Sequence, residues 1–194
     1  APRGGRGLMR ILLATDAWEP QVNGVVRTLT RVVAELRAMG DVVEVISPDQ
    51  FPTFPLPMYP EIKLARGAYE PMQERFKTFE PEAIHIATEG PIGLAARRLC
   101  QEWKLPFTTS YHTRFPEYVS ARLPLPLAAG YAYMKWFHKP SRRPMVTTPP
   151  MREELDRYDE LITRNEVELR KVMQELQRLE SHEKDQADKL KAGK

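Results

Sequence analysis

Through the first 150 residues, short apolar runs alternate with longer segments whose apolar residues recur at helical spacing. The clearest unit is an apolar strand at Arg10–Ala14, an amphipathic helix that ends before Gly40, and a second strand at Val42–Ile46. Strands that are apolar throughout are typical of parallel sheets covered on both faces, and parallel neighbours need a crossover of this length. The sequence therefore predicts an α/β fold with a doubly wound parallel sheet of the Rossmann type.

The same alternation continues along the chain. It predicts further strands at Ile62–Ala65, Ala83–Ala87, Pro106–Tyr111 and Pro144–Thr147, and helices at Tyr69–Phe79, Pro91–Trp103 and Leu125–His138. The segment Phe51–Pro60 carries four prolines. Because proline cannot donate a hydrogen bond to a sheet, this segment is predicted to be an irregular loop.

The composition changes at residue 150. All 18 prolines lie in residues 1–150, whereas 22 of the 44 residues from 151 to 194 are charged. We therefore predict three parts: residues 1–8 as a tag or disordered extension, residues 9–150 as the Rossmann-like domain, and residues 151–194 as a long charged helix.

Apolar residues in the last part repeat with heptad spacing. The seam consists of Leu155, Ile162, Leu169, Val172, Leu176 and Leu179. A seam of this kind is typical of a coiled coil and predicts self-association. The alternative is a single amphipathic helix that packs on its own domain.

Several classes of protein are excluded. No apolar run approaches the roughly 18 residues of a membrane span. The single cysteine, Cys100, excludes a disulfide scaffold or a cysteine-based zinc site and favours a reducing, cytoplasmic location. The basic residues are dispersed, so the pI of about 9.0 does not indicate nucleic-acid binding. No metal-ligand motif occurs, and we expect no metal or other cofactor.

Ligands of doubly wound sheets bind at the carboxyl ends of the strands, which selects a few loops. Asn23 and Gly24 follow the first strand and open the first helix. A glycine there allows close approach of an anion such as phosphate to the helix N-terminus. The alternative is a simple turn and helix start, and no G-x-G-x-x-G pattern supports a standard dinucleotide site.

Polar residues also follow two later strands. His112 and Arg114 could bind a sugar hydroxyl or a phosphate; the alternative for His112 is that it caps the strand end. Glu89 could accept hydrogen bonds from hydroxyl groups or complement the N-terminus of the following helix. His85 lies in mid-strand and is interpreted as a core histidine with satisfied hydrogen bonds.

Four segments carry a resemblance to a known family: ATDAWEPQVNGVVRTLTRVVAEL, ATEGPIGLAARRLC, PFTTSYHTRFPEYVSARLP and FHKPSRRPMVTTP. Together they resemble glycosyltransferase family 4, most of all its GDP-mannose-dependent mannosyltransferases and related sugar-lipid branches. The resemblance runs from Met9 to about Tyr158. It implies half of a GT-B fold, in which two Rossmann-like domains face each other across a cleft, and metal-independent transfer with retention.

The resemblance also implies roles for individual residues. Gly24 would lie near the donor phosphates, His112 would be the active-site histidine near the transferred sugar, and Asn23, Glu89 and Arg114 would line the cleft. The N-terminal domain mainly binds the acceptor in this family, and a lipid acceptor would bring it to the inner face of a membrane. Because the nucleotide-sugar is held by a C-terminal domain that these residues do not match, we expect the chain to be inactive alone.

Three functions remain open from the sequence. The first is the acceptor-side domain of a glycosyltransferase. The second is a coiled-coil assembly protein or engineered fusion that uses the α/β domain as a folded unit. The third is a non-catalytic module that binds a sugar phosphate or a nucleotide. Turnover of a nucleotide-sugar distinguishes the first, and a concentration-dependent mass distinguishes the second.

Overall fold

The computed structural model describes residues 8–56, 59–112, 116 and 126–146. The chain divides into two compact units, Ala1–Pro149 and Pro150–Lys194, and the described residues belong to the first. Arg114 and the heptad seam lie outside the described residues, so the predictions made for them stand as predictions.

The core of the fold is a parallel five-stranded sheet with strand order β2-β1-β5-β6-β7. Its strands are β1 (Arg10–Ala14), β2 (Val42–Ile46), β5 (Ala83–Ile86), β6 (Thr108–Tyr111) and β7 (Pro144–Val146). All four pairings are parallel. From β1 the chain moves to one side to form β2 and then returns to the other side to form β5, so the strand order reverses beside β1. The doubly wound sheet predicted from the sequence is confirmed.

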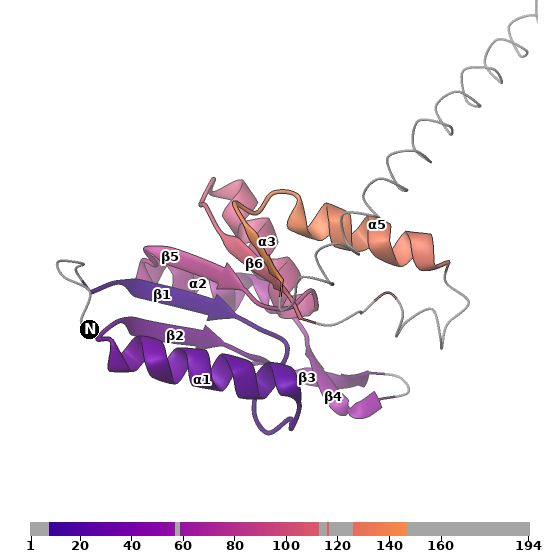
Figure 1. Cartoon of the computed structure of the whole chain (residues 1–194), viewed down its shortest axis with the longest axis horizontal. Coiled ribbons are helices and arrows are strands. Elements are labelled where there is room, and N and C mark those ends of the chain that lie inside the picture. Colours follow the sequence, from indigo (N-terminus) through magenta and orange to yellow (C-terminus); the bar gives the residue numbers. More distant parts are fainter. Residues whose placement is uncertain (1–7, 57–58, 113–115, 117–125, 147–194) are drawn as a thin grey trace, which may run out of the picture. The chain divides into compact units, whose positions relative to one another are not determined.

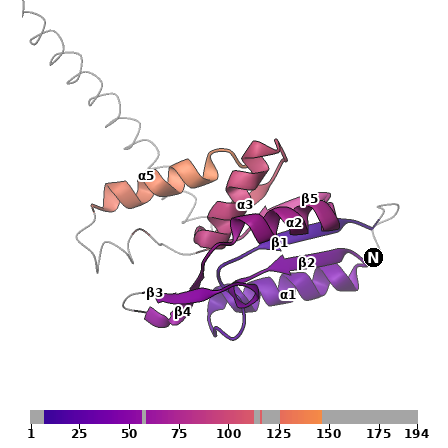
Figure 2. The same cartoon turned by 180° about the vertical axis from the view of Figure 1, so that it is seen from behind.

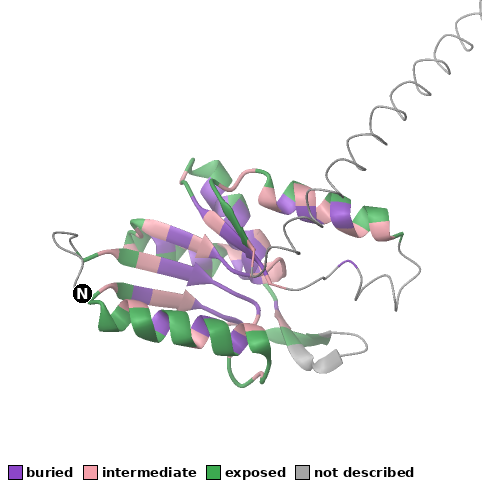
Figure 3. Cartoon of the chain, in the orientation of Figure 1, coloured by how far each residue is buried: buried purple, intermediate pink, exposed green. Residues whose placement is uncertain are grey.

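Helices cover both faces of this sheet (Figures 1 and 2). The four described helices are α1 (Gly24–Ala38), α2 (Tyr69–Phe79), α3 (Pro91–Glu102) and α5 (Leu127–His138). On one face, α1 packs Leu29 and Val33 against Leu13 and Val43. The other face is covered by α2 and α3, and Phe137 of α5 joins the core there. Figure 3 shows that buried residues concentrate along the strands between these helices.

The first helix follows directly from its sequence. Val26, Leu29 and Val33 recur at intervals of three and four residues and form its buried face. The Asn23 side chain caps its N-terminus by accepting a hydrogen bond from the Val26 N–H at 3.0 Å. Gly40 follows the C-terminus with a φ of 96°, a conformation that favours glycine.

The segment Phe51–Pro60 differs from its prediction. It was predicted to be irregular, but it supplies β3 (Thr53–Leu56) and part of β4 (Tyr59–Ala65), which pair as an antiparallel ribbon. A two-stranded ribbon has a free edge on each strand, and proline is tolerated where its missing N–H would point away from the partner. The predicted strand Ile62–Ala65 is thus part of β4 and does not join the main sheet.

The last of the described helices, α5, is anchored to α3 through a buried arginine. The Arg97 guanidinium group donates to the main-chain oxygens of Trp136 at 2.8 Å and Phe137 at 3.0 Å. It also stacks on the Trp136 ring, 3.8 Å from its centroid. A cation beside the last carbonyl groups of a helix is favourable because these groups carry partial negative charge. The end of α5 is therefore held in place from the α3 side.

Candidate functional site

The carboxyl ends of β1, β5 and β6 place three polar segments at one edge of the sheet. Asp16 follows β1, Glu89 follows β5 and His112 follows β6. These strands are neighbours in the order β1-β5-β6, and the reversal of strand order lies between β1 and β5. A reversal of this kind opens a crevice at the carboxyl edge, which is where ligands of such sheets bind.

Asp16 organises this edge by capping α3 from a different strand. Its carboxylate accepts hydrogen bonds from the N–H groups of Ile92 at 2.9 Å and Gly93 at 3.2 Å, and from the Thr88 hydroxyl at 2.8 Å. The Thr88 hydroxyl oxygen in turn accepts from the Asp16 N–H. Burial raises the pKa of Asp16, while these hydrogen bonds act in the opposite direction. The hydrogen-bond acceptor at the N-terminus of α3 is therefore a side chain of the protein itself.

Two glycines make this close packing feasible. A Cβ atom at Gly90 would lie 2.5 Å from the Asp16 carboxyl carbon. A Cβ atom at Gly93 would lie 1.8 Å from the main-chain oxygen of Thr88. Glu89 was one candidate to complement the N-terminus of α3, but Asp16 occupies that place in the structure. Asp16 lies two residues after the end of β1, and no sequence signal indicated a partner 76 residues away.

The N-terminus of α1 is built differently. The Asn23 side chain accepts a hydrogen bond from an N–H group in the first turn of α1. This cap agrees with the alternative that Asn23 and Gly24 form a simple turn and helix start. A Cβ atom at Gly24 would meet nothing within 4 Å, so the packing of the fold does not require glycine at this position. The space beside Gly24 is open to a ligand that approaches the main chain.

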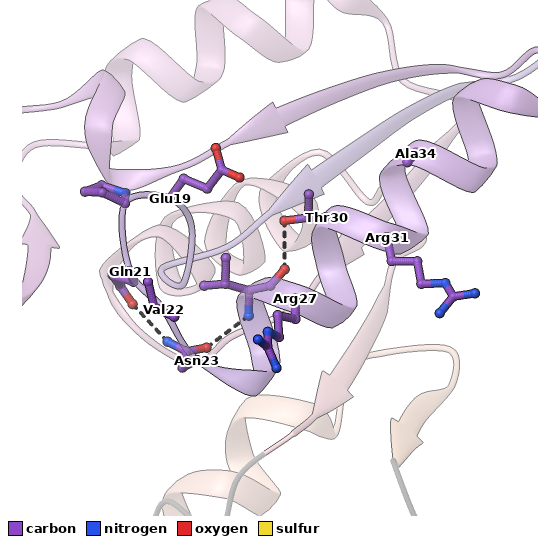
Figure 4. Close-up of a pocket in the computed structure, with 10 residues that line it drawn as sticks. Glu19, Gln21, Val22, Asn23, Arg27, Thr30, Arg31 and Ala34 are labelled. Carbon is purple, nitrogen blue, oxygen red and sulfur yellow. Dashed lines mark hydrogen bonds between the residues drawn. The ribbon is translucent and has the colours of Figure 1, made fainter.

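A groove lies beside α1 from Val26 to Ala34, with a volume of about 660 Å³ (Figure 4). One wall is the segment Glu19–Asn23, and the other is formed by Val26, Arg27, Thr30, Arg31 and Ala34 of α1. Asn23 is the predicted site residue that borders this groove; Gly24, Glu89 and His112 do not line it. The groove therefore adjoins the N-terminus of α1 but does not by itself unite the predicted site.

Glu89 lies beside a histidine that the sequence analysis did not select. Its Oε1 atom is 3.3 Å from Nε2 of His138, with side chains that are 15% and 11% exposed. The main-chain oxygen of Glu89 accepts a hydrogen bond from the Tyr133 hydroxyl at 2.6 Å. Burial raises the pKa of Glu89, and His138 opposes that shift. Glu89, Tyr133 and His138 thus form a cluster between the β5–α3 connection and α5.

His112 is half-buried at the end of β6. Its Nε2 atom is buried and has no hydrogen-bond partner among the described residues. Burial lowers the pKa of His112, which favours the neutral imidazole. A neutral ring whose buried nitrogen lacks a partner can accept from, or donate to, a polar group of a ligand.

His85 has the structural role that the sequence predicted. Its Nδ1 atom lies 2.8 Å from the Thr108 hydroxyl, and its Nε2 atom lies 2.8 Å from the Ser110 hydroxyl. Both partners belong to the neighbouring strand, β6. The ring is therefore satisfied within the sheet.

Four of the predicted site residues lie at or beside the carboxyl edge, because they follow strands whose carboxyl ends meet there. Asn23 and Gly24 lie at the start of α1, Glu89 follows β5, and His112 follows β6. Asp16, Tyr133 and His138 were missed, because each acts through a partner distant in sequence. Within the described part of the chain, no group of three acidic, histidine or cysteine side chains could hold a metal ion.

A doubly wound α/β sheet with polar side chains at its carboxyl edge is typical of the class of Rossmann-like folds, whose ligands bind at that edge. The model of glycosyltransferase family 4 matches residues 22–168, most of the chain. The chain belongs to this family, and the resemblance seen in the sequence is confirmed.

Curated proteins that resemble the chain do so at low sequence identity. The chain is 27% identical over 124 residues to alpha-monoglucosyldiacylglycerol synthase of Streptococcus pneumoniae, covering 57% of this chain and 28% of that protein. It is 24% identical over 166 residues to GDP-mannose-dependent alpha-mannosyltransferase of Mycobacterium tuberculosis, covering 76% of this chain and 44% of that protein. The protein of the same name from Mycolicibacterium smegmatis is 25% identical over 165 residues, with coverage of 76% and 44%.

The matches span less than half the length of these relatives. No solved structure matches the chain significantly. Among the described residues, no helix is long and apolar enough to cross a membrane.

Proposed function

We propose that these residues form the acceptor-side half of a retaining glycosyltransferase that transfers a sugar from a nucleotide-sugar to a lipid or glycan acceptor. The family match over residues 22–168 carries this proposal. GDP-mannose is the proposed donor, because two of the relatives are named as GDP-mannose-dependent mannosyltransferases. A lipid acceptor is suggested by the relative named as a diacylglycerol glycolipid synthase, and it would bring the domain to a membrane surface.

The proposal gives each residue of the edge a chemical role. The donor phosphates would approach the main chain at Gly24, where the partial positive charge of the α1 N-terminus favours an anion. His112 would bind the transferred sugar through its Nε2 atom, which has no partner in the described part of the chain. Glu89 would accept hydrogen bonds from hydroxyl groups of the ligand.

An assay of nucleotide-sugar turnover by the 194-residue chain tests whether these residues form only half of the enzyme. We expect no enzyme-dependent release of nucleoside diphosphate from GDP-mannose or UDP-glucose, because the family holds its donor in a second domain. Release above the enzyme-free control would contradict this expectation.

Binding tests the site itself. Titration with millimolar GDP-mannose, followed by NMR of the labelled chain, should shift the amide signals of Gly24 and His112 together. The substitution His112→Ala should weaken the shifts while changing the free energy of unfolding by less than about 1 kcal/mol, since no described hydrogen bond of the ring is lost. Unaltered signals at both residues, or a loss of several kcal/mol in His112→Ala, would count against the assigned roles.

A further inference from the structure

Glu89 and His138 bring two ionisable groups together at the carboxyl edge. The distance of 3.3 Å between Glu89 Oε1 and His138 Nε2 is that of an ion pair. The two atoms are not aligned as a hydrogen bond, and neither has another hydrogen-bond partner among the described residues. A buried polar atom without a hydrogen bond loses its contact with water and gains nothing in return. A proton between Glu89 Oε1 and His138 Nε2 would give each of these atoms a partner.

The His138 ring is held from its other side. Its Nδ1 atom lies 2.9 Å from the Thr109 hydroxyl, which donates to the Ser141 hydroxyl at 3.2 Å. The ring also makes edge contacts with Tyr111 and Phe137. These contacts fix the orientation of the imidazole without Glu89 and leave Nε2 as the atom that faces the carboxyl group.

The other ionisable groups facing Glu89 cannot stabilise its charge. Asp16, from the segment after β1, adds to the effect of burial in raising the pKa of Glu89. Tyr133 of α5 donates its hydroxyl to the main-chain oxygen of Glu89. Burial raises the pKa of Tyr133 to about 12, so it stays neutral. Among the described groups that face this carboxyl, His138 alone places a ring nitrogen that can donate a proton toward it.

We propose that His138 is a positioning residue for Glu89: a proton on its Nε2 atom, shared with the Glu89 carboxyl group, keeps Glu89 charged as an acceptor for ligand hydroxyl groups. The ligand in this statement rests on the proposed function, whereas the shared proton does not. Glu89 contacts the ligand, and His138 acts through Glu89. The imidazole takes this role because Thr109 and Arg97 already hold the end of α5 in place.

The ionisation of Glu89 can be measured directly. NMR of the ¹³C-labelled side-chain carboxyl group, assigned with Glu89→Gln, gives its titration midpoint in the intact chain. In His138→Phe, which keeps an aromatic ring beside Tyr111 and Phe137, we expect the midpoint to rise by about one pH unit, since burial remains while the proton donor is lost.

Two further variants make the result specific. Thr109→Val removes the partner of Nδ1 without changing the size of the buried side chain, and it should raise the midpoint by a smaller amount. Lys139→Gln removes an exposed positive charge next to His138 in sequence, and it should leave the midpoint unchanged.

An unchanged Glu89 midpoint in folded His138→Phe would overturn the proposal, as would an equal rise in Lys139→Gln. If circular dichroism shows that His138→Phe does not fold, Thr109→Val decides: a rise supports the shared proton and no change overturns it. None of these readouts involves a sugar or turnover. Failure of the pair therefore leaves the proposed function standing, and failure of GDP-mannose binding leaves the pair standing.

Discussion

His85 shows how one buried residue links the fold to pH. Burial, with a smaller contribution from His112, lowers the pKa of His85 to about 4 from its ordinary 6.5. The imidazole lies between the Thr108 and Ser110 hydroxyls, and each can act as donor or acceptor to a neutral ring. The native state therefore favours neutral His85, whereas the unfolded chain protonates it below about pH 6.5.

This difference predicts a loss of stability in acid. Between pH 6.5 and 4 the unfolded state binds the extra proton, so the free energy of unfolding should fall as the pH falls, by up to about 3 kcal/mol from His85. Urea unfolding of wild type and His85→Gln at pH 7 and pH 4.5 measures this contribution. The loss should be smaller in the variant, and the comparison cancels the opposite effects of Asp16 and Glu89, whose pKa values are raised. An equal loss in both proteins would contradict the assignment to His85.

At the scale of the elements, the starts of α1 and α3 form a contrasting pair. Both helices follow a strand of the sheet at its carboxyl edge and have a glycine in the first turn. At α3 the glycine lies against the main chain of Thr88, and the N-terminus is occupied by Asp16. At α1 the glycine faces open space. One helix start is thus filled by the protein itself, and the other has room for a ligand.

Alanine substitutions should separate these two situations. Gly93→Ala forces a Cβ atom against a main-chain oxygen that cannot move freely, and we expect a loss of at least about 3 kcal/mol. Gly24→Ala adds a methyl group in open space, and alanine favours a helix by up to about 1 kcal/mol over glycine. Its stability should therefore equal or slightly exceed that of wild type. Urea midpoints of the two variants measure the difference, and similar midpoints would show that the packing around Gly93 is looser than the structure indicates.

At the scale of the whole molecule, the heptad seam beyond residue 150 predicts self-association. Apolar side chains from Leu155 to Leu179 lose about 1.5–3 kcal/mol each if they stay in water rather than a core, so the seam favours a partner surface. Light scattering over a dilution series should give a mass above 22.4 kDa that falls on dilution.

Substitutions on and off the seam provide the control. Leu169→Asp places a charge in the seam and should shift the mass to that of the monomer, whereas Gln174→Asp, off the seam in the same heptad pattern, should not. A wild-type chain that is monomeric at every concentration would exclude self-association. If Leu169→Asp then also destabilised the α/β domain, the helix would instead pack on its own domain.

The sequence by itself determined the main sheet, its helices and the edge that carries the candidate site. Periodicity is a local property, so α1, α2 and the strands β1 and β2 were predicted to within a residue or two. The order of strand and helix then carried Gly24, Glu89 and His112 to the carboxyl edge, because every parallel strand ends there. No tertiary contact is needed for this conclusion.

Only the tertiary structure decided which side chains meet at that edge. The hydrogen bonds of Asp16 with α3 span 76 and 77 residues, and His138 approaches Glu89 from a helix that forms much later in the chain. Such contacts depend on strand register and helix packing, which no local pattern encodes. The ribbon of β3 and β4 was missed for a related reason. Proline lacks a main-chain N–H, which disrupts a strand only where the partner strand would accept a hydrogen bond from it. Which positions these are depends on how the two strands pair.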